Sequence, residues 1–374
     1  MLSRIAESLY WLGRHVERAD CTARILDTYL HLLPTGSWQT DHQVIRSLVE
    51  SMGLRGDTEL EGADPSQLVR TLVFDPERPS SVSGALMAAR DNARGVRDAL
   101  PLDVWECLNV TWHGLRSRTS SGGGPHTYLR WVAERCAMSA GLVDEVMSHD
   151  EGWHFLAVGR ALERADMTIR LLAAADSQTG SVPPWRALVS ACGGWEPYVR
   201  EHGGMVGQHT AAAFVLLDRR FPRSVLRSLT AAETSLAELE ALSGSPVRDP
   251  RRDPSSARRI VGRTRTGLDY RTGTELPAEL PTLLAALQRT VHSAHVAVSR
   301  SFFRRGDEVT WATIGAEQLA AQHLSAQHLS GQRRSAPGSP AAPAGSPASR
   351  PPVTLPVQPG APVATAPALP GGLA

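Results

Sequence analysis

Apolar residues recur at alternating spacings of three and four between Ile5 and Leu33. This spacing places an apolar stripe along one face of an α-helix. The same pattern returns between Phe155 and Leu172. Both segments are therefore predicted to be long amphipathic helices, the first with Ser3 as its N-cap.

Most of the remaining chain also shows helical periodicity. No segment shows a convincing alternation of period two bounded by turn residues. Further helices are predicted at about 41–54, 65–74, 80–99, 102–118, 127–148, 183–192, 208–217, 223–242, 255–268 and 278–304. The expected fold is all-α, a bundle of long antiparallel helices.

Three phrases occur twice in the chain, in the same order. GRHVERAD at residues 13–20 recurs as GRALERAD 146 residues later, and RSLVESMG and FDPERPSSV recur as RALVSACG and LDRRFPRSV at offsets of 140 and 143. Such self-similarity indicates an internal duplication of a unit of roughly 145 residues. We expect two related halves, residues 1–148 and 149–316, packed as one domain about a pseudo-twofold axis.

The composition changes from about residue 317. A short repeat, AQHLSAQHLS, is followed by a tract rich in Pro, Ala, Gly and Ser that runs to residue 374. Such a tract cannot bury enough apolar surface to offset the entropy of ordering. Residues 317–374 are therefore predicted to be a disordered tail.

The composition excludes several classes of function. The net charge of +1 over 374 residues argues against a nucleic-acid partner. All 39 basic residues are arginine, so no Schiff-base, P-loop or nucleophilic lysine is available. No run of 18 apolar residues is present, so no membrane partner is expected. Four widely spaced cysteines and the lack of an apolar signal segment predict a cytoplasmic location.

The repeated polar motif provides the main candidate site. Arg14, Glu17 and Arg18 lie opposite the apolar stripe at spacings of three and four, so their head groups are expected to converge. Tyr10 lies one turn earlier on the same face. The second copy repeats this arrangement with Arg160, Glu163 and Arg164.

Two interpretations of the motif remain open. If these faces meet another layer of helices, Glu17 and Glu163 are internal counter-ions that fix helix register. If they line a cleft, the arginines would hold a carboxylate or phosphate, with the glutamate as orienter or base. A carboxylate between arginines should have a lowered pKa, which makes it a poor general base.

Four acidic residues are secondary candidates. Asp150 and Glu151 fall at a predicted helix start, where capping is a better explanation than metal binding by the nearby histidines. Asp75 and Asp218 are equivalent residues in a duplicated phrase and are expected to cap or turn before the helices that follow. No catalytic residue is assigned, and no cofactor or metal site is predicted.

Several of these motifs resemble the bacterial alpha-E family, an α-helical domain of unassigned activity named for its Glu-Arg motif. The resemblance runs from residue 1 to about Phe303 and does not include the tail. It is carried by Tyr10–Ala19, Asp150–Trp153, Gly159–Thr168 and Leu216–Val225.

The resemblance implies a genomic and functional context. Alpha-E proteins are encoded beside, or fused to, circularly permuted ATP-grasp proteins, and often near transglutaminase-like proteins, in what has been interpreted as a peptide or amide synthesis and modification system. We therefore expect a helical accessory or interaction subunit without its own covalent chemistry. Its expected partner is a circularly permuted ATP-grasp protein, with a transglutaminase-like protein as a second candidate. The alternative is an enzyme whose twin Arg-Glu-Arg sites bind an acidic peptide or a phosphorylated intermediate.

Overall fold

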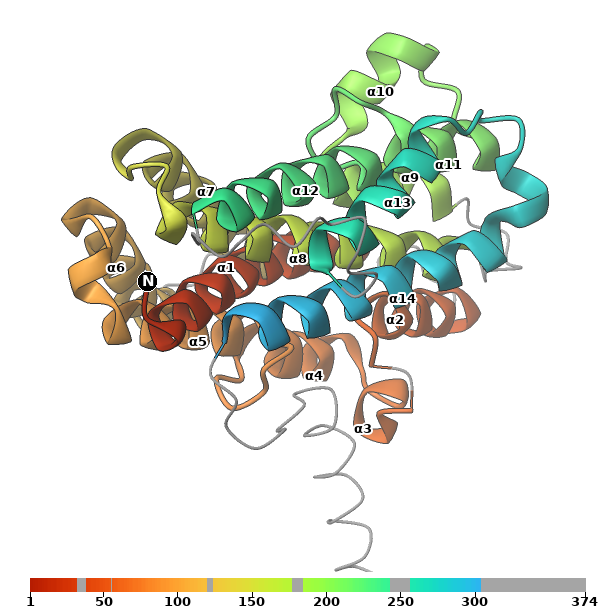
Figure 1. The fold of residues 1–374 in the computed structure, drawn as a ribbon. Helices are drawn as coiled ribbons and strands as arrows, with labels where there is room; N and C mark the ends of the chain where they lie inside the picture. Colours follow the sequence, from red (N-terminus) through yellow and green to blue (C-terminus); the bar gives the residue numbers. More distant parts are fainter. Residues whose placement is uncertain (32–37, 55, 120–123, 177–183, 243–255, 304–374) are drawn as a thin grey trace, which may run out of the picture. The chain divides into compact units, whose positions relative to one another are not determined.

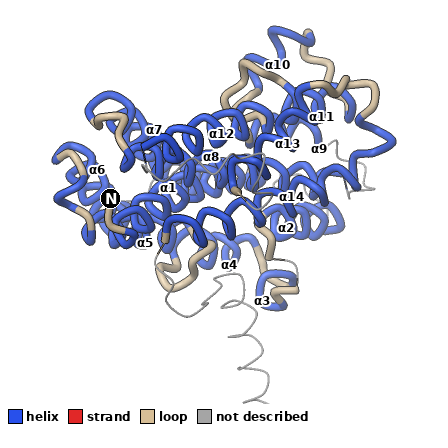
Figure 2. Tube along the Cα trace, in the orientation of Figure 1, coloured by secondary structure: helices blue, strands red, loops and turns tan. Residues whose placement is uncertain are grey.

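Every regular element in the described part of the chain is a helix, which confirms the all-α prediction (Figure 2). The computed structural model describes residues 1–31, 38–54, 56–119, 124–176, 184–242 and 256–303. These residues fall within one compact unit, Met1–Gly306. The predicted disordered tail, residues 317–374, and the last part of the predicted second half lie outside the described residues.

The first series of helices runs from α1 to α7. Its members are α1 (Ser3–Leu30), α2 (Trp38–Ser51), α3 (Thr58–Glu61), α4 (Pro65–Val69) with a π-helical turn (Arg70–Phe74), α5 (Val82–Gly95) with a 3-10 turn (Arg97–Ala99), α6 (Leu102–Thr119) and α7 (Gly124–Val146).

The second series repeats this order from α8 to α14. Its members are α8 (Glu151–Asp176), α9 (Pro184–Ala191), α10 (Trp195–His202), α11 (Gln208–Leu217), α12 (Val225–Leu242), α13 (Ala257–Asp269) and α14 (Leu276–Phe302). Helix α7 ends shortly before residue 148 and α8 begins shortly after it, so the predicted boundary between the halves lies in their connection.

Helices α1 and α8 share the most extensive interface between helices of the described part (Figure 1). Helix α5 packs on α1, and α12 packs on α8 in the equivalent way. The two halves also exchange an element, since α2 of the first half packs on α8 while α9 of the second half packs on α1. The halves are therefore interlocked around the α1–α8 pair.

Two glycines allow the backbones of α1 and α8 to approach closely. A Cβ atom added at Gly13 would overlap the carbonyl oxygen of Leu156, and one added at Gly159 would overlap the carbonyl oxygen of Tyr10. These contacts are reciprocal at the same offset of 146 residues. Such reciprocity is the property of a twofold relation between the two helices.

The turns before α5 and α12 are also copies of each other. The Ser81 hydroxyl donates to the carbonyl oxygen of Asp75, and the Ser224 hydroxyl donates to the carbonyl oxygen of Asp218. Each serine oxygen then accepts from the amide three residues further on, at 2.8 Å and 3.1 Å respectively. The expectation that Asp75 and Asp218 act in turns is confirmed: each carboxylate accepts from the amide two residues ahead.

The predicted helix start at Asp150 is confirmed, whereas the prediction that Ser3 is the N-cap of the first helix is wrong. Oδ1 of Asp150 accepts from the amides of Gly152 and Trp153 at 2.8 and 3.2 Å. Ser3 is instead the first residue of α1, and Leu2 occupies the N-cap position without a side-chain hydrogen bond. Within the described residues, no helix combines the length and apolar character that a bilayer span requires.

Candidate functional site

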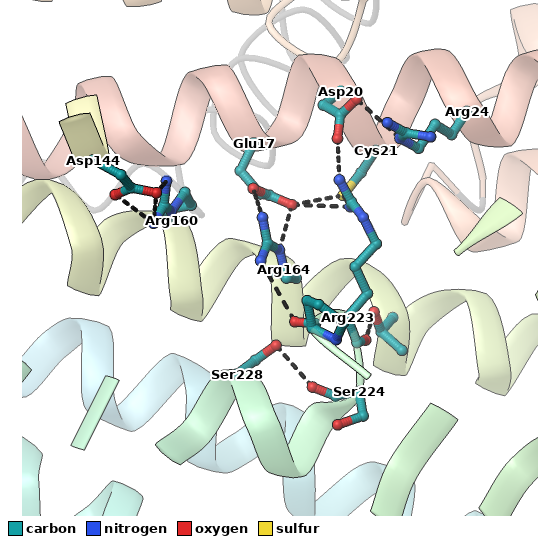
Figure 3. Close-up of polar contacts among 12 residues, drawn as sticks. Glu17, Asp20, Cys21, Arg24, Asp144, Arg160, Arg164, Arg223, Ser224 and Ser228 are labelled. Atoms are coloured by element: carbon teal, nitrogen blue, oxygen red, sulfur yellow. Dashed lines mark hydrogen bonds and ion pairs between the residues drawn. The ribbon is translucent and has the colours of Figure 1, made fainter. Parts of the chain in front are cut away.

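The contact between α1 and α8 brings the two copies of the motif together. Figure 3 shows Glu17 on α1 facing Arg164 on α8, with Arg223 entering from the turn before α12. Because the two helices cross at their glycines, the polar residues one turn further along each helix meet the partner helix rather than solvent.

Glu17 accepts three hydrogen bonds from two arginines. Nε and Nη2 of Arg164 donate to its two carboxylate oxygens, each at 2.7 Å. Nη1 of Arg223 donates to Oε1 at 3.0 Å. Glu17 is only 4% exposed. These charge-assisted bonds, one pair of them bidentate, occupy both carboxylate oxygens.

Glu163 is held in the equivalent way by the first half. Nε of Arg14 donates to Oε2 and Nε of Arg18 donates to Oε1, each at 2.6 Å. Glu163 is 1% exposed. Each motif glutamate is thus the counter-ion of arginines from the other half.

The expected convergence of each triplet on its own helix is therefore wrong. Arg14 and Arg18 donate to Glu163 on α8, and not to Glu17 on their own helix. The face opposite the apolar stripe is as deeply buried as the stripe itself: Val16 on the stripe is half-buried, whereas Glu17 is buried. This is the first of the two interpretations, in which the motif faces meet another layer of helices. The reason is that α1 is covered on both sides, since α8 packs over its polar face.

Arg160 departs from the symmetry of the motif. Its first-half equivalent, Arg14, is buried against Glu163. Arg160 instead pairs with Asp144 on α7 at 3.2 Å, and both side chains are partly exposed. Five of the six motif residues thus form ion pairs between the halves, in one cluster around Glu163 and another around Glu17. Arg160 belongs to neither cluster, and Figure 3 shows it paired with Asp144, apart from Glu17.

The network extends beyond the predicted motif through Asp20 and Arg223. Nη2 of Arg223 contacts Oδ2 of Asp20, while Nε of Arg24 donates to Oδ1 of Asp20 at 3.0 Å. The second half repeats the last pair, with Nε of Arg170 donating to Asp166 at 2.9 Å. Both aspartates belong to the repeated phrase, so the sequence held a signal for them.

Arg223 was missed because it is not duplicated. Its equivalent in the first half, at an offset of 143, is Ser80. Repetition therefore could not mark it, although it lies within a repeated phrase. Its contacts with Glu17 and Asp20 make it the residue that joins the two carboxylates.

Tyr10 is fully buried at one edge of the network. Nη1 of Arg14 donates to its hydroxyl at 3.2 Å, and the same hydroxyl lies 2.9 Å from Nδ1 of His295 on α14. Burial, with a smaller contribution from the charge of Arg14, lowers the pKa of His295 to about 4. Tyr10 therefore ties the network to the last helix of the described part.

The arginines determine the protonation of both glutamates. Burial acts to raise the pKa of Glu17, but the charges of Arg164 and Arg223 outweigh it and hold the pKa at about 2. Burial acts in the same direction on Glu163, and Arg18 and Arg14 outweigh it, so its pKa lies well below the ordinary value. The prediction of a lowered pKa is confirmed, and both carboxylates are ionised at neutral pH.

The remaining candidate, Glu151, lies in the first turn of α8. It forms a salt bridge with the amino group of Met1 at 2.7 Å. An acidic residue in this position also complements the helix dipole. Its observed contact is an ion pair that joins the first residues of the two halves.

The network has little capacity for acid–base chemistry or for holding a cofactor. Both glutamates are buried, fully bonded to arginines and held in the ionised state. Every arginine of the network is already paired with Glu17, Glu163 or Asp20, so none presents an unpaired guanidinium group to an anion. What the arrangement does is to fasten the two halves together at their crossing.

Comparison with known proteins gives a family and several relatives. A family described as a predicted alpha-helical domain with a conserved ER motif matches residues 1–303. Uncharacterised proteins from Mycobacterium bovis and Mycobacterium tuberculosis are 26% identical over 269 residues, a match that covers 65% of this chain and 30% of each relative. The chain thus spans about 30% of the length of these curated relatives. No solved structure matches the chain.

Proposed function

The chain belongs to the Alpha-E family, and from this membership we propose that it is a non-catalytic helical subunit of a peptide or amide modification system, acting on a circularly permuted ATP-grasp protein by binding to it. The observation that carries the proposal is the reciprocal burial of Glu17 and Glu163, each held by two arginines of the opposite half.

A general base must accept a proton near neutral pH and must reach the substrate. Glu17 meets neither condition, since its pKa is about 2 and arginines occupy both of its oxygens. Glu163 is still more buried. The motif is therefore best explained as a brace, which leaves the outer surfaces of the helices to carry the function through binding.

The length of the relatives supports a function in partnership. The matched region forms 30% of each mycobacterial relative, so in those proteins it is one part of a longer chain. The ATP-grasp partner is implied by the resemblance to the family. A transglutaminase-like protein is the second candidate partner, and we place the system in the cytoplasm.

The alternative is an enzyme that binds an acidic peptide or phosphorylated intermediate at twin Arg-Glu-Arg sites. It requires motif head groups that open towards solvent. The burial of both glutamates argues against it, and the partly exposed Arg160 does not restore it because Asp144 compensates its charge.

Co-purification tests the proposal directly. The tagged full-length chain is expressed with a circularly permuted ATP-grasp protein, and the complex is isolated by affinity and size-exclusion chromatography. We expect a stable complex, ATP-dependent ligation only when the partner is present, and no turnover by the chain alone. The same experiment with residues 1–303 asks whether the family domain is sufficient for binding.

Two outcomes separate the alternatives. Turnover by the isolated chain, abolished in Glu17→Gln and Glu163→Gln without loss of thermal stability, would establish the enzyme and overturn the proposal. Failure to bind either partner candidate would also overturn it. A gel shift with nucleic acid over a range of salt concentrations is expected to show no binding.

A further inference from the structure

A second polar cluster lies where the C-terminal end of α1 meets the first turn of α7. Asp27 in the last turn of α1 and His31, the C-cap residue of that helix, are four residues apart, so their side chains share a face. His126 approaches from α7, and its Nδ1 lies 2.8 Å from Oδ1 of Asp27. One potential ligand atom from each of the three residues lies within 4.8 Å of the other two.

Independently of the proposed function, we infer that Asp27, His31 and His126 form a binding site for a divalent transition-metal ion of the zinc class. Imidazole nitrogens and a carboxylate oxygen are ligands that such ions favour. The ring centroids of His31 and His126 are only 3.9 Å apart, so both imidazoles converge on the same carboxylate.

The orientation of His31 fits a ligand role. Its Nδ1 lies 2.6 Å from the backbone carbonyl oxygen of Asp27. Metal-binding histidines commonly donate one ring N–H to a carbonyl or carboxylate, which fixes the tautomer and leaves the other nitrogen to bind the ion. With Nδ1 engaged in this contact, Nε2 of His31 is the nitrogen left to bind an ion.

The dimensions of the cluster require only side-chain adjustment. Ligand distances of about 2.1 Å in a tetrahedral arrangement place ligand atoms about 3.4 Å apart. The side chains of Asp27, His31 and His126 are 35, 61 and 44% exposed, so they have room to rotate inward. With three protein ligands and this exposure, a bound ion would keep a coordination position for water or an external ligand.

The cluster is not part of the duplicated framework. At the offset of 146 that relates the two motif copies, the residue equivalent to Asp27 is Ala173 on α8, which packs against the core. The Arg–Glu brace and the glycine crossing occur in both halves. An architecture that works in the second half without the carboxylate does not need Asp27 for packing.

Metal titration tests the inference. The full-length chain is stripped with a chelator and then titrated with Zn²⁺ by calorimetry and with Co²⁺ by visible absorption, whose d–d bands report the ligand set. We expect one equivalent of each ion and a rise in Tm on addition of Zn²⁺. Asp27→Asn, His31→Ala and His126→Ala should each weaken binding at least tenfold and abolish the Tm rise.

Two controls keep the test decisive. Asp27→Asn preserves an oxygen that can accept from His126, so its fold should match wild type in the chelated state. His113→Ala removes an exposed histidine of α6 outside the cluster and should leave binding unchanged. No stoichiometric binding by the wild type would overturn the inference, as would binding that survives the combined Asp27→Asn, His31→Ala, His126→Ala variant.

Discussion

At the scale of single residues, substitutions that break the buried pairs of the Arg–Glu network should be strongly destabilising. Glu163 is 1% exposed and is the acceptor for both Arg14 and Arg18. Glu163→Gln keeps the size of the side chain but strands two guanidinium groups. Breaking a buried pair in this way typically costs 3–5 kcal/mol. We therefore expect the free energy of unfolding to fall by about 3 kcal/mol in urea denaturation.

Asp144 provides the matched control for this prediction. It pairs with Arg160 through partly exposed side chains. Exposed pairs contribute about 1 kcal/mol or less, because solvent screens them. Asp144→Asn should thus be nearly neutral, and equal losses in the two variants would contradict a structural role for the buried network.

The lowered pKa of Glu17 predicts a dependence of stability on acid. The pKa falls from an ordinary 4.5 to about 2 in the folded state, so the unfolded chain takes up the proton first. The stabilisation is fully present above pH 4.5 and is lost as the pH falls towards 2. The difference in unfolding free energy between wild type and Glu17→Gln should be constant above pH 4.5 and shrink below it. Other titrating groups, such as His295, cancel in this difference, and a difference that grows in acid would contradict the assignment.

The sequence identified most of the network residues but not their pairing. Repetition identified Arg14, Glu17 and Arg18 as candidate residues. Exposure to solvent alone does not explain why the same charged residues occur in both halves. Spacing along one helix then suggested partners three and four residues away, whereas the structure pairs each glutamate across the crossing. Which helix faces which is set by long-range packing, and local spacing carries no information about it. The cluster of Asp27, His31 and His126 was not predicted from the sequence for the same reason, because His126 comes from a distant helix.

At the scale of helices, the crossing of α1 and α8 depends on its two glycines. A methyl group at Gly13 would overlap the backbone of α8, and one at Gly159 would overlap that of α1. Because backbone cannot yield as a side chain can, Gly13→Ala should lower the free energy of unfolding by about 1–3 kcal/mol. Thermal and urea denaturation would measure it.

Gly141, inside α7, is the control for the helix crossing. An added Cβ there meets nothing within 4 Å. Ala has the higher helix propensity, so Gly141→Ala should stabilise the protein by up to about 1 kcal/mol. If both substitutions were stabilising, the close approach of α1 and α8 would be wrong.

Helical periodicity located most elements and missed those too short to show it. The long segments α1, α7, α8, α12 and α14 follow their predicted ranges closely. Helix α10 was not predicted: it spans only Trp195–His202, and glycines flank it on both sides. Periodicity also gave α1 one buried face, although α8 buries the opposite face through ion pairs. An interface formed by ion pairs leaves no pattern of apolar residues in the sequence. Only the repetition of the charged phrase therefore indicated that this face of α1 is buried.

At the scale of the whole described unit, the exchange of partners makes the halves depend on each other. Arg14 and Arg18 of the first half pair with Glu163 of the second, and Arg164 of the second half pairs with Glu17 of the first. Helices α2 and α9 also pack on the central helix of the opposite half. A half on its own would expose apolar surface and leave its buried charges without counter-ions.

Division of the chain at residue 148 should therefore give fragments that fold only together. The cut falls between α7 and α8 and breaks no helix. Residues 1–148 and 149–303 should each show low helicity by circular dichroism when purified alone, and native helicity with one-to-one association when mixed. Glu163→Gln in the second fragment should weaken that association by roughly a hundredfold, the equivalent of about 3 kcal/mol. A first fragment that reaches native helicity and a cooperative melt without its partner would contradict the reciprocal brace, because Arg14 and Arg18 would then be stable without Glu163.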